Sequence, residues 1–213
     1  MKQILVYGDS LSWGIIPDTR SRLAFEHRWP GSLEISLNRM GCACRIVENC
    51  LNGRRTVWGD PFKAGRNGSE TLSQAVESGS PLALVIIALG TNDFQSTHQN
   101  GADASALGIA ALIDTIRASP IEPGMPTPAI LILAPPTIVE PRGAIASKFN
   151  AAHERCRGHV EAYRNVSRSK AVHFFDINSV TGPSVVDGVH LDQNQHAAVS
   201  QALLPVVRTI VSF

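Results

Sequence analysis

The stretch ILVYGDSLSWG, residues 4–14, runs from a continuous apolar segment directly into Gly8, Asp9 and Ser10. Two kinds of structure produce this pattern. One is a buried strand that ends in an ordinary Gly-Asp-Ser turn, and the other is a strand whose carboxyl end presents a nucleophilic serine. The stretch does not distinguish them, so the choice depends on the residues at the ends of the other strands.

Four further segments have the same continuous apolar character and the length of a buried strand. They are residues 44–49, 82–89, 129–133 and 172–175, which with residues 3–7 give five predicted strands. Helical patterns occupy residues 29–40, 69–78, 109–116, 149–163 and 199–210, and Pro205 is expected to kink or interrupt the last one. This strict alternation predicts an α/β fold with a five-stranded parallel sheet covered by helices on both faces. The carboxyl ends of the strands then gather at one edge, where open α/β sheets bind ligands.

Length and composition restrict the class of protein. The 213 residues suit a single domain, residues 1–213, with 44% hydrophobic residues, 17% charged residues and a net charge of +1. This charge balance provides no basic surface for nucleic acid or for an anionic membrane. No apolar stretch approaches the roughly 20 residues of a membrane helix, and the N-terminal apolar run is too short for a signal peptide. We therefore expect a cytoplasmic protein without nucleic-acid or membrane partners.

The cysteines and short motifs argue against a cofactor. Cys42, Cys44, Cys50 and Cys156 are expected to be reduced thiols with structural roles, because their spacing is not that of a metal or redox site. No strand is followed by a glycine-rich phosphate-binding motif, and no His/Cys cluster suggests a catalytic metal. The segment GDSLS also lacks the second glycine of the G-x-S-x-G elbow, which disfavours the α/β-hydrolase fold.

Residues suited to catalysis follow four of the five predicted strands. Ser10 follows the first strand, Gly53 the second and Asn92 the third, and Asp187 and His190 lie in the loop that follows the fifth. A serine hydroxyl is a weak nucleophile until a base accepts its proton, and His190 is the histidine with a carboxylate three residues upstream. Asp187 would orient the His190 ring. Together these are the parts of serine acyl-transfer chemistry.

An oxyanion hole has three candidate donors, the backbone N–H groups of Ser10 and Gly53 and the side-chain amide of Asn92. Structural alternatives exist, since Gly53 can close a turn and Asn92 can cap the segment after its strand. We interpret Asp9 as a structural residue that hydrogen-bonds the loop backbone and holds Ser10, because Asp187 already supplies the acid.

Loops at the same edge supply candidate substrate-pocket residues. These are Ser12, Trp13, Asn52, Trp58 and Phe94. For the aromatic residues, packing of the loops against the protein is an equally good explanation. An apolar pocket would exclude water from an acyl-enzyme and let a bound alcohol accept the acyl group.

Four blocks of the sequence together resemble the SGNH hydrolases, which are the GDSL-type esterases and lipases. GDSLSWG is similar to the first block, with Ser10 as nucleophile; NCLNGRRT to the second, with Gly53; LGTNDF to the third, with Asn92; and DGVHLD to the last, with Asp187 and His190. The blocks occur in the order of the family and extend from residue 4 to about residue 200. The second block departs from the pattern, because Leu51 stands where the family usually has asparagine.

The resemblance implies a flavodoxin-like, three-layer α/β/α sandwich and ester hydrolysis without a cofactor. GDSLSWG, the Arg28-Trp29 pair and NGRRT are most similar to the small bacterial arylesterase/acyltransferase branch of the family. Members of that branch cleave short-chain and aryl esters, and some transfer acyl groups to alcohols or peroxide and form higher oligomers. We therefore expect a homo-oligomeric serine esterase that acts on a small-molecule ester, with acyl transfer to alcohols as a further activity.

Two kinds of alternative are consistent with the same sequence. A deacetylase, thioesterase or lysophospholipase of this family would use the same catalytic residues, and its preference for acyl-chain length would separate it from a short-chain esterase. A flavodoxin-like binding domain would have the fold without turnover, and Ser10 would then fail to react with an organophosphonate.

Overall fold

The computed structural model describes residues 1–212 and contains one five-stranded parallel sheet. The strands are β1 (Lys2–Gly8), β2 (Cys44–Cys50), β3 (Leu84–Ala88), β4 (Ala129–Ala134) and β5 (His173–Asp176). Their order across the sheet is β2-β1-β3-β4-β5, so β1 lies inside the sheet, hydrogen-bonded to β2 on one side and to β3 on the other. The α/β fold and the five-stranded parallel sheet predicted from the sequence are confirmed.

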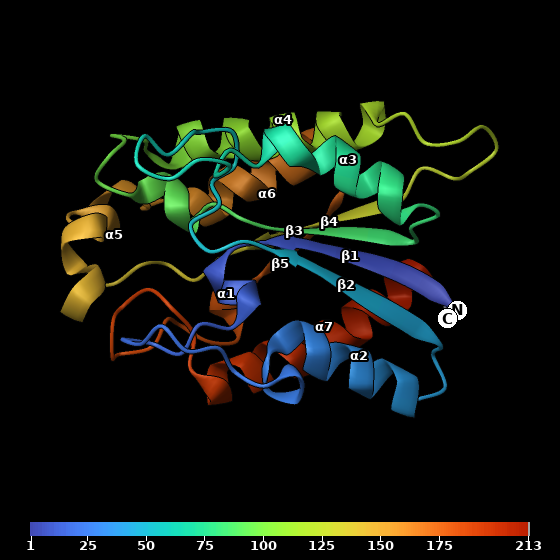
Figure 1. The fold of residues 1–213 in the computed structure, drawn as a ribbon, viewed down its shortest axis with the longest axis horizontal. Helices are drawn as coiled ribbons and strands as arrows, with labels where there is room; N and C mark the ends of the chain where they lie inside the picture. Colours follow the sequence, from blue (N-terminus) through green and yellow to red (C-terminus); the bar gives the residue numbers. More distant parts are fainter. Residues whose placement is uncertain (213) are drawn as a thin grey trace.

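Helices cover both faces of this sheet (Figure 1). One face carries α3 (Ser69–Gly79), α4 (Ala102–Ala118) and α6 (His159–Lys170), and the other carries α2 (Trp29–Arg39) and α7 (Gln193–Val211). Successive side chains of β1 enter different cores, because Ile4 and Val6 pack with α2 and α7 whereas Leu5 and Tyr7 pack with α3 and α4. This double burial explains why the strand is apolar without interruption.

Short elements occupy the carboxyl edge of the sheet. They are α1 (Ser10–Trp13), η1 (Phe25–His27), η2 (Thr91–Phe94), η3 (Gly143–Phe149), α5 (Ala152–Arg155) and η4 (Ile177–Ser179). A third apolar cluster lies under this edge and includes Phe94, Ile138 and Phe149. The loops that carry the predicted catalytic residues are therefore anchored by a core of their own.

Two helix predictions need correction. The single helix predicted over residues 149–163 is divided among η3, α5 and α6, because Ala151 and Gly158 adopt left-handed φ angles of 56° and 83° that a continuous helix does not allow. The final helix, in contrast, passes through Pro205 without interruption. Pro205 lies on the exposed side of α7, and its carbonyl oxygen still accepts a hydrogen bond from Thr209 Oγ1 at 3.0 Å.

The cysteines form no disulfide among the described residues. All four cysteines are free thiols, and Cys42, Cys44 and Cys156 are buried. Throughout residues 1–212, no helix has both the length and the apolar character required to cross a membrane.

Candidate active site

Ser10 lies where β1 turns sharply into α1. Asp9 caps this short helix by accepting a hydrogen bond from the backbone N–H of Leu11 at 2.9 Å, and Gly14 ends it with a left-handed φ of 84°. The turn holds the buried Ser10 at the carboxyl edge of the sheet. Asp9 thus bonds the loop backbone next to Ser10, which confirms the structural interpretation of this carboxylate.

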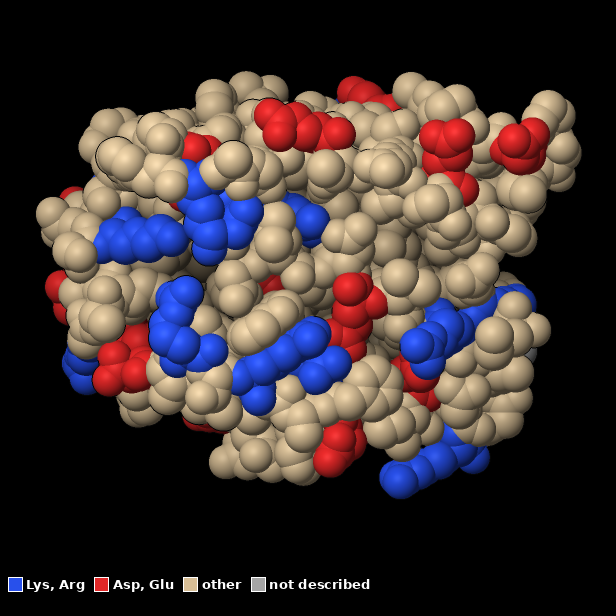
Figure 2. All heavy atoms as spheres, viewed as in Figure 1, with Lys and Arg blue, Asp and Glu red and all other residues tan. Residues whose placement is uncertain are grey.

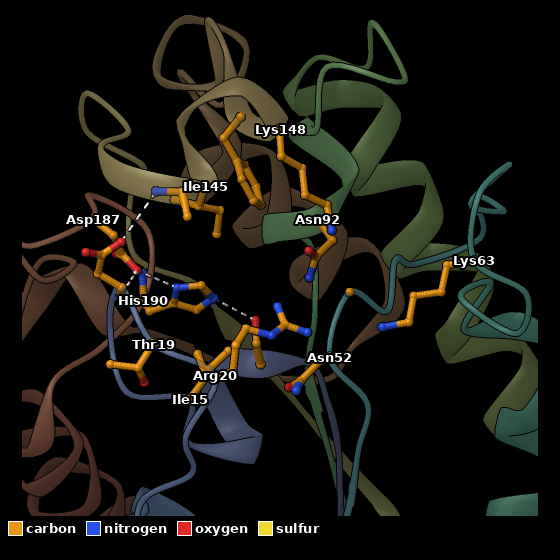
Figure 3. A pocket seen from close by; sticks show the side chains of 15 residues that line it. Ile15, Thr19, Arg20, Asn52, Lys63, Asn92, Ile145, Lys148, Asp187 and His190 are labelled. Atoms are coloured by element: carbon orange, nitrogen blue, oxygen red, sulfur yellow. Dashed lines mark hydrogen bonds and ion pairs between the residues drawn. The ribbon is translucent and has the colours of Figure 1, made fainter.

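His190 joins Ser10 to Asp187 through two hydrogen bonds. Its Nε2 lies 3.1 Å from Ser10 Oγ, and its Nδ1 lies 2.6 Å from Asp187 Oδ2. When the ring carries its proton on Nδ1, this N–H donates to the carboxylate, and the Nε2 lone pair faces the serine hydroxyl. The structure therefore brings these three residues together in the order that serine catalysis requires, although they come from opposite ends of the chain (Figure 3).

Asp187 is fixed by its own turn. Its Oδ1 accepts the backbone N–H groups of Val189 at 3.0 Å and His190 at 2.9 Å, and Gly188 provides the left-handed φ of 76°. Burial raises the pKa of Asp187, but the hydrogen bond and charge of His190 and the two backbone N–H groups lower this pKa by more. Asp187 therefore remains ionised at neutral pH and can stabilise positive charge on His190.

Asn92 lies in η2, two residues beyond the glycine that follows β3. Its Nδ2 donates a hydrogen bond to Asp9 Oδ2 at 2.8 Å, and its Oδ1 accepts one from Gln95 Nε2 at 2.5 Å. These two contacts fix the orientation of the amide, and the second N–H of Nδ2 is left for a ligand. Because Asn92 and Ser10 line the same cavity, this amide can donate to an oxyanion formed at Ser10.

Gly53 lies in the turn after β2 with a left-handed φ of 83°, a conformation that favours glycine. Leu51, which occupies the expected asparagine position, donates its backbone N–H to the carbonyl oxygen of Gly8 at 3.0 Å. This bond attaches the turn to the end of β1, independently of the Leu51 side chain. Gly53 borders the same cavity as Ser10 and Asn92.

Two residues that sequence reasoning misses, Arg55 and Gln95, support Asn92. Both are fully buried, and Arg55 donates to the Asn92 carbonyl oxygen at 3.1 Å and to Gln95 Oε1 at 2.6 Å. Arg55 also forms a 3.4 Å ion pair with Asp60. The arginine is visible in NGRRT, but a charged residue in a polar segment gives no sign of burial.

A second buried carboxylate anchors η2 to the neighbouring elements. Asp93 accepts hydrogen bonds from the backbone N–H of Thr56 at 2.9 Å, from Thr56 Oγ1 at 2.8 Å and from Ser105 Oγ at 2.6 Å. Burial raises the pKa of Asp93 to about 6, although these hydrogen bonds oppose the rise. The loop after β2, η2 and α4 are thereby held together beneath Asn92.

Ser10 lines a cavity of about 270 Å³, and Figure 3 shows Asn92, Ile145 and His190 around it. Its lining combines the polar Ser10, His190 and Asn92 with the apolar Ile145 and Phe149. This volume accommodates a small organic ester. Within residues 1–212, no three His, Cys, Asp or Glu side chains lie together in a way that could hold a metal ion.

Of the five candidate pocket residues, Asn52 lines this cavity. Among the described residues, the cavity lining does not include the other four, which are Ser12, Trp13, Trp58 and Phe94. Ser12 is buried and lies against Gly8, and Phe94 packs in the third apolar cluster. Trp13 lies under the guanidinium of Arg22. The ring centroids of Trp58 and His98 are 6.3 Å apart. For these aromatic side chains the packing explanation fits the geometry better than pocket lining. The apolar wall comes instead from residues such as Ile15, Ile145 and Phe149.

Comparisons with known proteins point to the same chemistry. Residues 6–198 match the sequence model of the GDSL-like Lipase/Acylhydrolase family. A carbohydrate acetylesterase family member from Sinorhizobium meliloti is 33% identical, with 100% of both chains covered and a TM-score of 0.93. No curated protein matches the chain.

Two further solved structures carry arylesterase names. The M. smegmatis aryl esterase is 30% identical to this chain, with 99% of this chain and 100% of that chain covered and a TM-score of 0.91. A proposed arylesterase from Agrobacterium tumefaciens is 38% identical over the same shares of the two chains, with a TM-score of 0.90.

Proposed function

Because the chain belongs to the GDSL-like lipase/acylhydrolase family and is an SGNH serine esterase, we propose that it cleaves short-chain or aryl esters through an acyl-enzyme formed on Ser10. The observation that carries this proposal is the continuous chain of hydrogen bonds from Asp187 through His190 to Ser10 Oγ at the base of the cavity. The names of the similar structures, arylesterase and acetylesterase, support small acyl groups or aryl alcohols as the parts of the substrate.

In the first half of the reaction, Ser10 Oγ attacks the carbonyl carbon of the ester while His190 Nε2 accepts the hydroxyl proton. Asp187 stabilises the resulting imidazolium through Nδ1. The carbonyl oxygen becomes an oxyanion, for which the backbone N–H groups of Ser10 and Gly53 and Nδ2 of Asn92 are the proposed donors. Each such donor typically contributes about 3 kcal/mol to stabilising the transition state.

The tetrahedral intermediate collapses when the ester C–O bond breaks and His190 gives its proton to the leaving alkoxide. The alcohol departs, and the acyl group stays on Ser10. Water then attacks the acyl-enzyme while His190 accepts its proton, and the acid leaves as Ser10 regains its hydrogen. The apolar wall formed by Ile15, Ile145 and Phe149 favours a bound alcohol over water at this step, which supports acyl transfer as a further activity of the same intermediate.

The test is hydrolysis of p-nitrophenyl acetate by the wild type and by Ser10→Ala. We expect the substitution to lower kcat by about three orders of magnitude or more, because the nucleophile is removed while the binding groups remain. Ser12→Ala is the matched control, since it removes a neighbouring hydroxyl that lies outside the described cavity lining. Circular dichroism and thermal unfolding of all three proteins establish that they are folded.

Labelling with an organophosphonate provides an independent readout. We expect one covalent adduct per chain, located at Ser10 by peptide mass mapping, and none in Ser10→Ala. Equal turnover by wild type and Ser10→Ala, together with no adduct, would instead support the flavodoxin-like binding domain.

A further inference from the structure

Three basic side chains reach the candidate active site from different parts of the chain. Arg20 lies between α1 and η1, Lys63 lies between β2 and α3, and Lys148 belongs to η3. All three line the cavity, and their charged ends extend into it in Figure 3. Figure 2 shows Lys and Arg side chains gathered around a hollow at the end of the molecule where the strands of Figure 1 have their carboxyl ends.

None of these three cations has a carboxylate as its direct partner among the described residues. In the part of the chain that the structure describes, no side-chain ion pair or hydrogen bond joins Arg20, Lys63 or Lys148 to a carboxylate. The acidic residues of the lining are Asp18 and Asp187, and Asp187 is occupied by His190. The lining therefore holds three cations against the two carboxylates Asp18 and Asp187, and the nearby Asp60 is already paired with Arg55, so an excess of positive charge lies next to the nucleophile.

Lys148 has the most informative position of the three. A Cβ placed on Gly53 would lie 3.9 Å from Lys148 Nζ, so the ammonium is adjacent to the proposed oxyanion hole. Partial desolvation lowers the pKa of Lys148, the charges of Arg55, Lys63 and Arg20 lower it further, and Asp60 opposes them. The basic groups are therefore close enough to repel one another, a repulsion that a bound anion would remove.

We propose that the ester hydrolysed by this enzyme carries an anionic group, a carboxylate or a phosphate, which Arg20, Lys63 and Lys148 bind while Ser10 attacks the ester carbonyl. This inference rests on the serine esterase function proposed above and adds the charge of the substrate to it. Charge-assisted hydrogen bonds from a guanidinium and two ammonium groups suit the oxygens of either anion. The neutral remainder of the ester fits against Ile15, Ile145 and Phe149.

Matched pairs of esters test the proposal, with each enzymatic rate divided by the rate of hydroxide hydrolysis of the same ester. On the alcohol side, 4-acetoxybenzoate is compared with methyl 4-acetoxybenzoate, and 4-acetoxyphenyl phosphate with phenyl acetate. On the acyl side, the mono-4-nitrophenyl ester of adipic acid is compared with 4-nitrophenyl hexanoate. We expect kcat/KM for the anionic member of at least one pair to exceed that of its neutral partner by about tenfold. Raising the salt concentration should reduce this preference, since ions screen the attraction.

Two double variants separate the cavity charges from overall charge. Lys63→Met/Lys148→Met should bring the preference close to one. Most of the change should be a rise in KM for the anionic ester. Arg39→Met/Arg208→Met removes the same charge from exposed positions on α2 and α7 and should retain the preference. The proposal would be overturned if the normalised kcat/KM were equal for the two esters of every pair, or if the preference for the anionic ester survived in Lys63→Met/Lys148→Met. If no ester is cleaved at all, the esterase function itself fails, which is a different result from cleavage without preference.

Discussion

At the scale of single residues, Asp9 connects two parts of the candidate site that are far apart in sequence. One of its carboxylate oxygens holds the N-terminus of α1 through Leu11, and the other accepts the amide of Asn92. Asp9 thus positions both the nucleophile and a proposed oxyanion donor, although it does not itself border the cavity. Burial raises the pKa of Asp9 to about 6 against the opposing effects of the Leu11 hydrogen bond, the His190 charge and the Asn92 hydrogen bond.

This raised pKa makes a prediction about Asp9→Asn. The unfolded chain loses the Asp9 proton near pH 4 and the folded protein near pH 6, so Asp9 contributes stability below pH 4 that is lost as pH rises through 6. Asparagine has no such titration. The free energy of unfolding of Asp9→Asn, relative to wild type, should therefore rise by about 2 kcal/mol between pH 4 and pH 7. Urea denaturation at each pH measures it.

Asp103→Asn, an exposed substitution in the first turn of α4, is the matched control and should follow the wild-type pH dependence. A constant difference between Asp9→Asn and wild type at every pH would show that Asp9 is not titrating in this range. The same variant should lower kcat for p-nitrophenyl acetate by about tenfold or more, because Asn92 loses the carboxylate that orients it.

At the scale of elements, the connection from β3 to η2 depends on Gly90. Its φ of 125° belongs to a region that residues with side chains rarely adopt. A Cβ at this position would also lie 1.9 Å from the Tyr163 hydroxyl oxygen, and that hydroxyl is bonded to Ser105 at 2.5 Å. The glycine in LGTNDF therefore lets the chain turn tightly enough to place Asn92 over the end of β1.

Gly90→Ala should consequently reduce both stability and activity. The strained φ and the clash with Tyr163 together predict a loss of about 3 kcal/mol in the free energy of unfolding. Displacement of Asn92 should lower kcat for p-nitrophenyl acetate by about tenfold or more. Gly182→Ala, at an exposed loop position with no neighbouring atom within 4 Å of the added Cβ, is the control and should change stability by less than about 0.5 kcal/mol. Similar losses in the two variants would contradict the role given to Gly90.

The elements also show which features a sequence reveals. Each predicted strand matches the observed one to within two residues at either end, because a strand buried on both faces must be apolar throughout. The helix predicted over residues 149–163 is wrong, since its periodicity is real but the chain breaks at Ala151 and Gly158. Phe149 and Tyr163 in fact enter different apolar clusters, a division that depends on tertiary packing.

The candidate site divides in the same way. Ser10, Asn92, Asp187 and His190 could be found from sequence because their chemistry requires particular residue types at strand ends. Arg55 could not, because its role comes from contacts with segments around residues 59 and 92–97 that only the folded chain brings together. The basic lining of the cavity likewise combines residues from three separate segments whose charges do not stand out in a chain of net charge +1.

At the scale of the whole molecule, the sheet separates two helical layers, and His196 fastens the layer formed by α2 and α7. This histidine is fully buried in the first turn of α7, and its Nδ1 accepts the backbone N–H of Trp29, the first residue of α2, at 3.2 Å. One of the unsatisfied N–H groups at the start of α2 is thereby paired. Burial, and the charges of Arg28 and His190, lower the pKa of His196 to about 3.

The stability of the molecule in acid should therefore depend on His196. Below pH 6.5 the unfolded chain protonates this histidine, whereas the folded protein does not until about pH 3. The free energy of unfolding therefore decreases as the pH is lowered from 6.5 to 3. In His196→Asn the asparagine oxygen can accept the Trp29 N–H without titrating. Between pH 7 and pH 5 the wild type should lose about 2 kcal/mol more than this variant, as measured by urea denaturation.

The opposite pH dependence of Asp9 and Asp93 is the same in both proteins, so their difference isolates His196. His173→Asn, at the exposed start of β5, is the matched control and should track the wild type. If His196→Asn and wild type lose stability in parallel on acidification, the burial of a neutral imidazole between α2 and α7 does not limit acid stability. If they diverge as expected, protonation of the imidazole buried between α2 and α7 contributes to acid unfolding, and esterase activity in acid should be retained to lower pH by His196→Asn than by wild type.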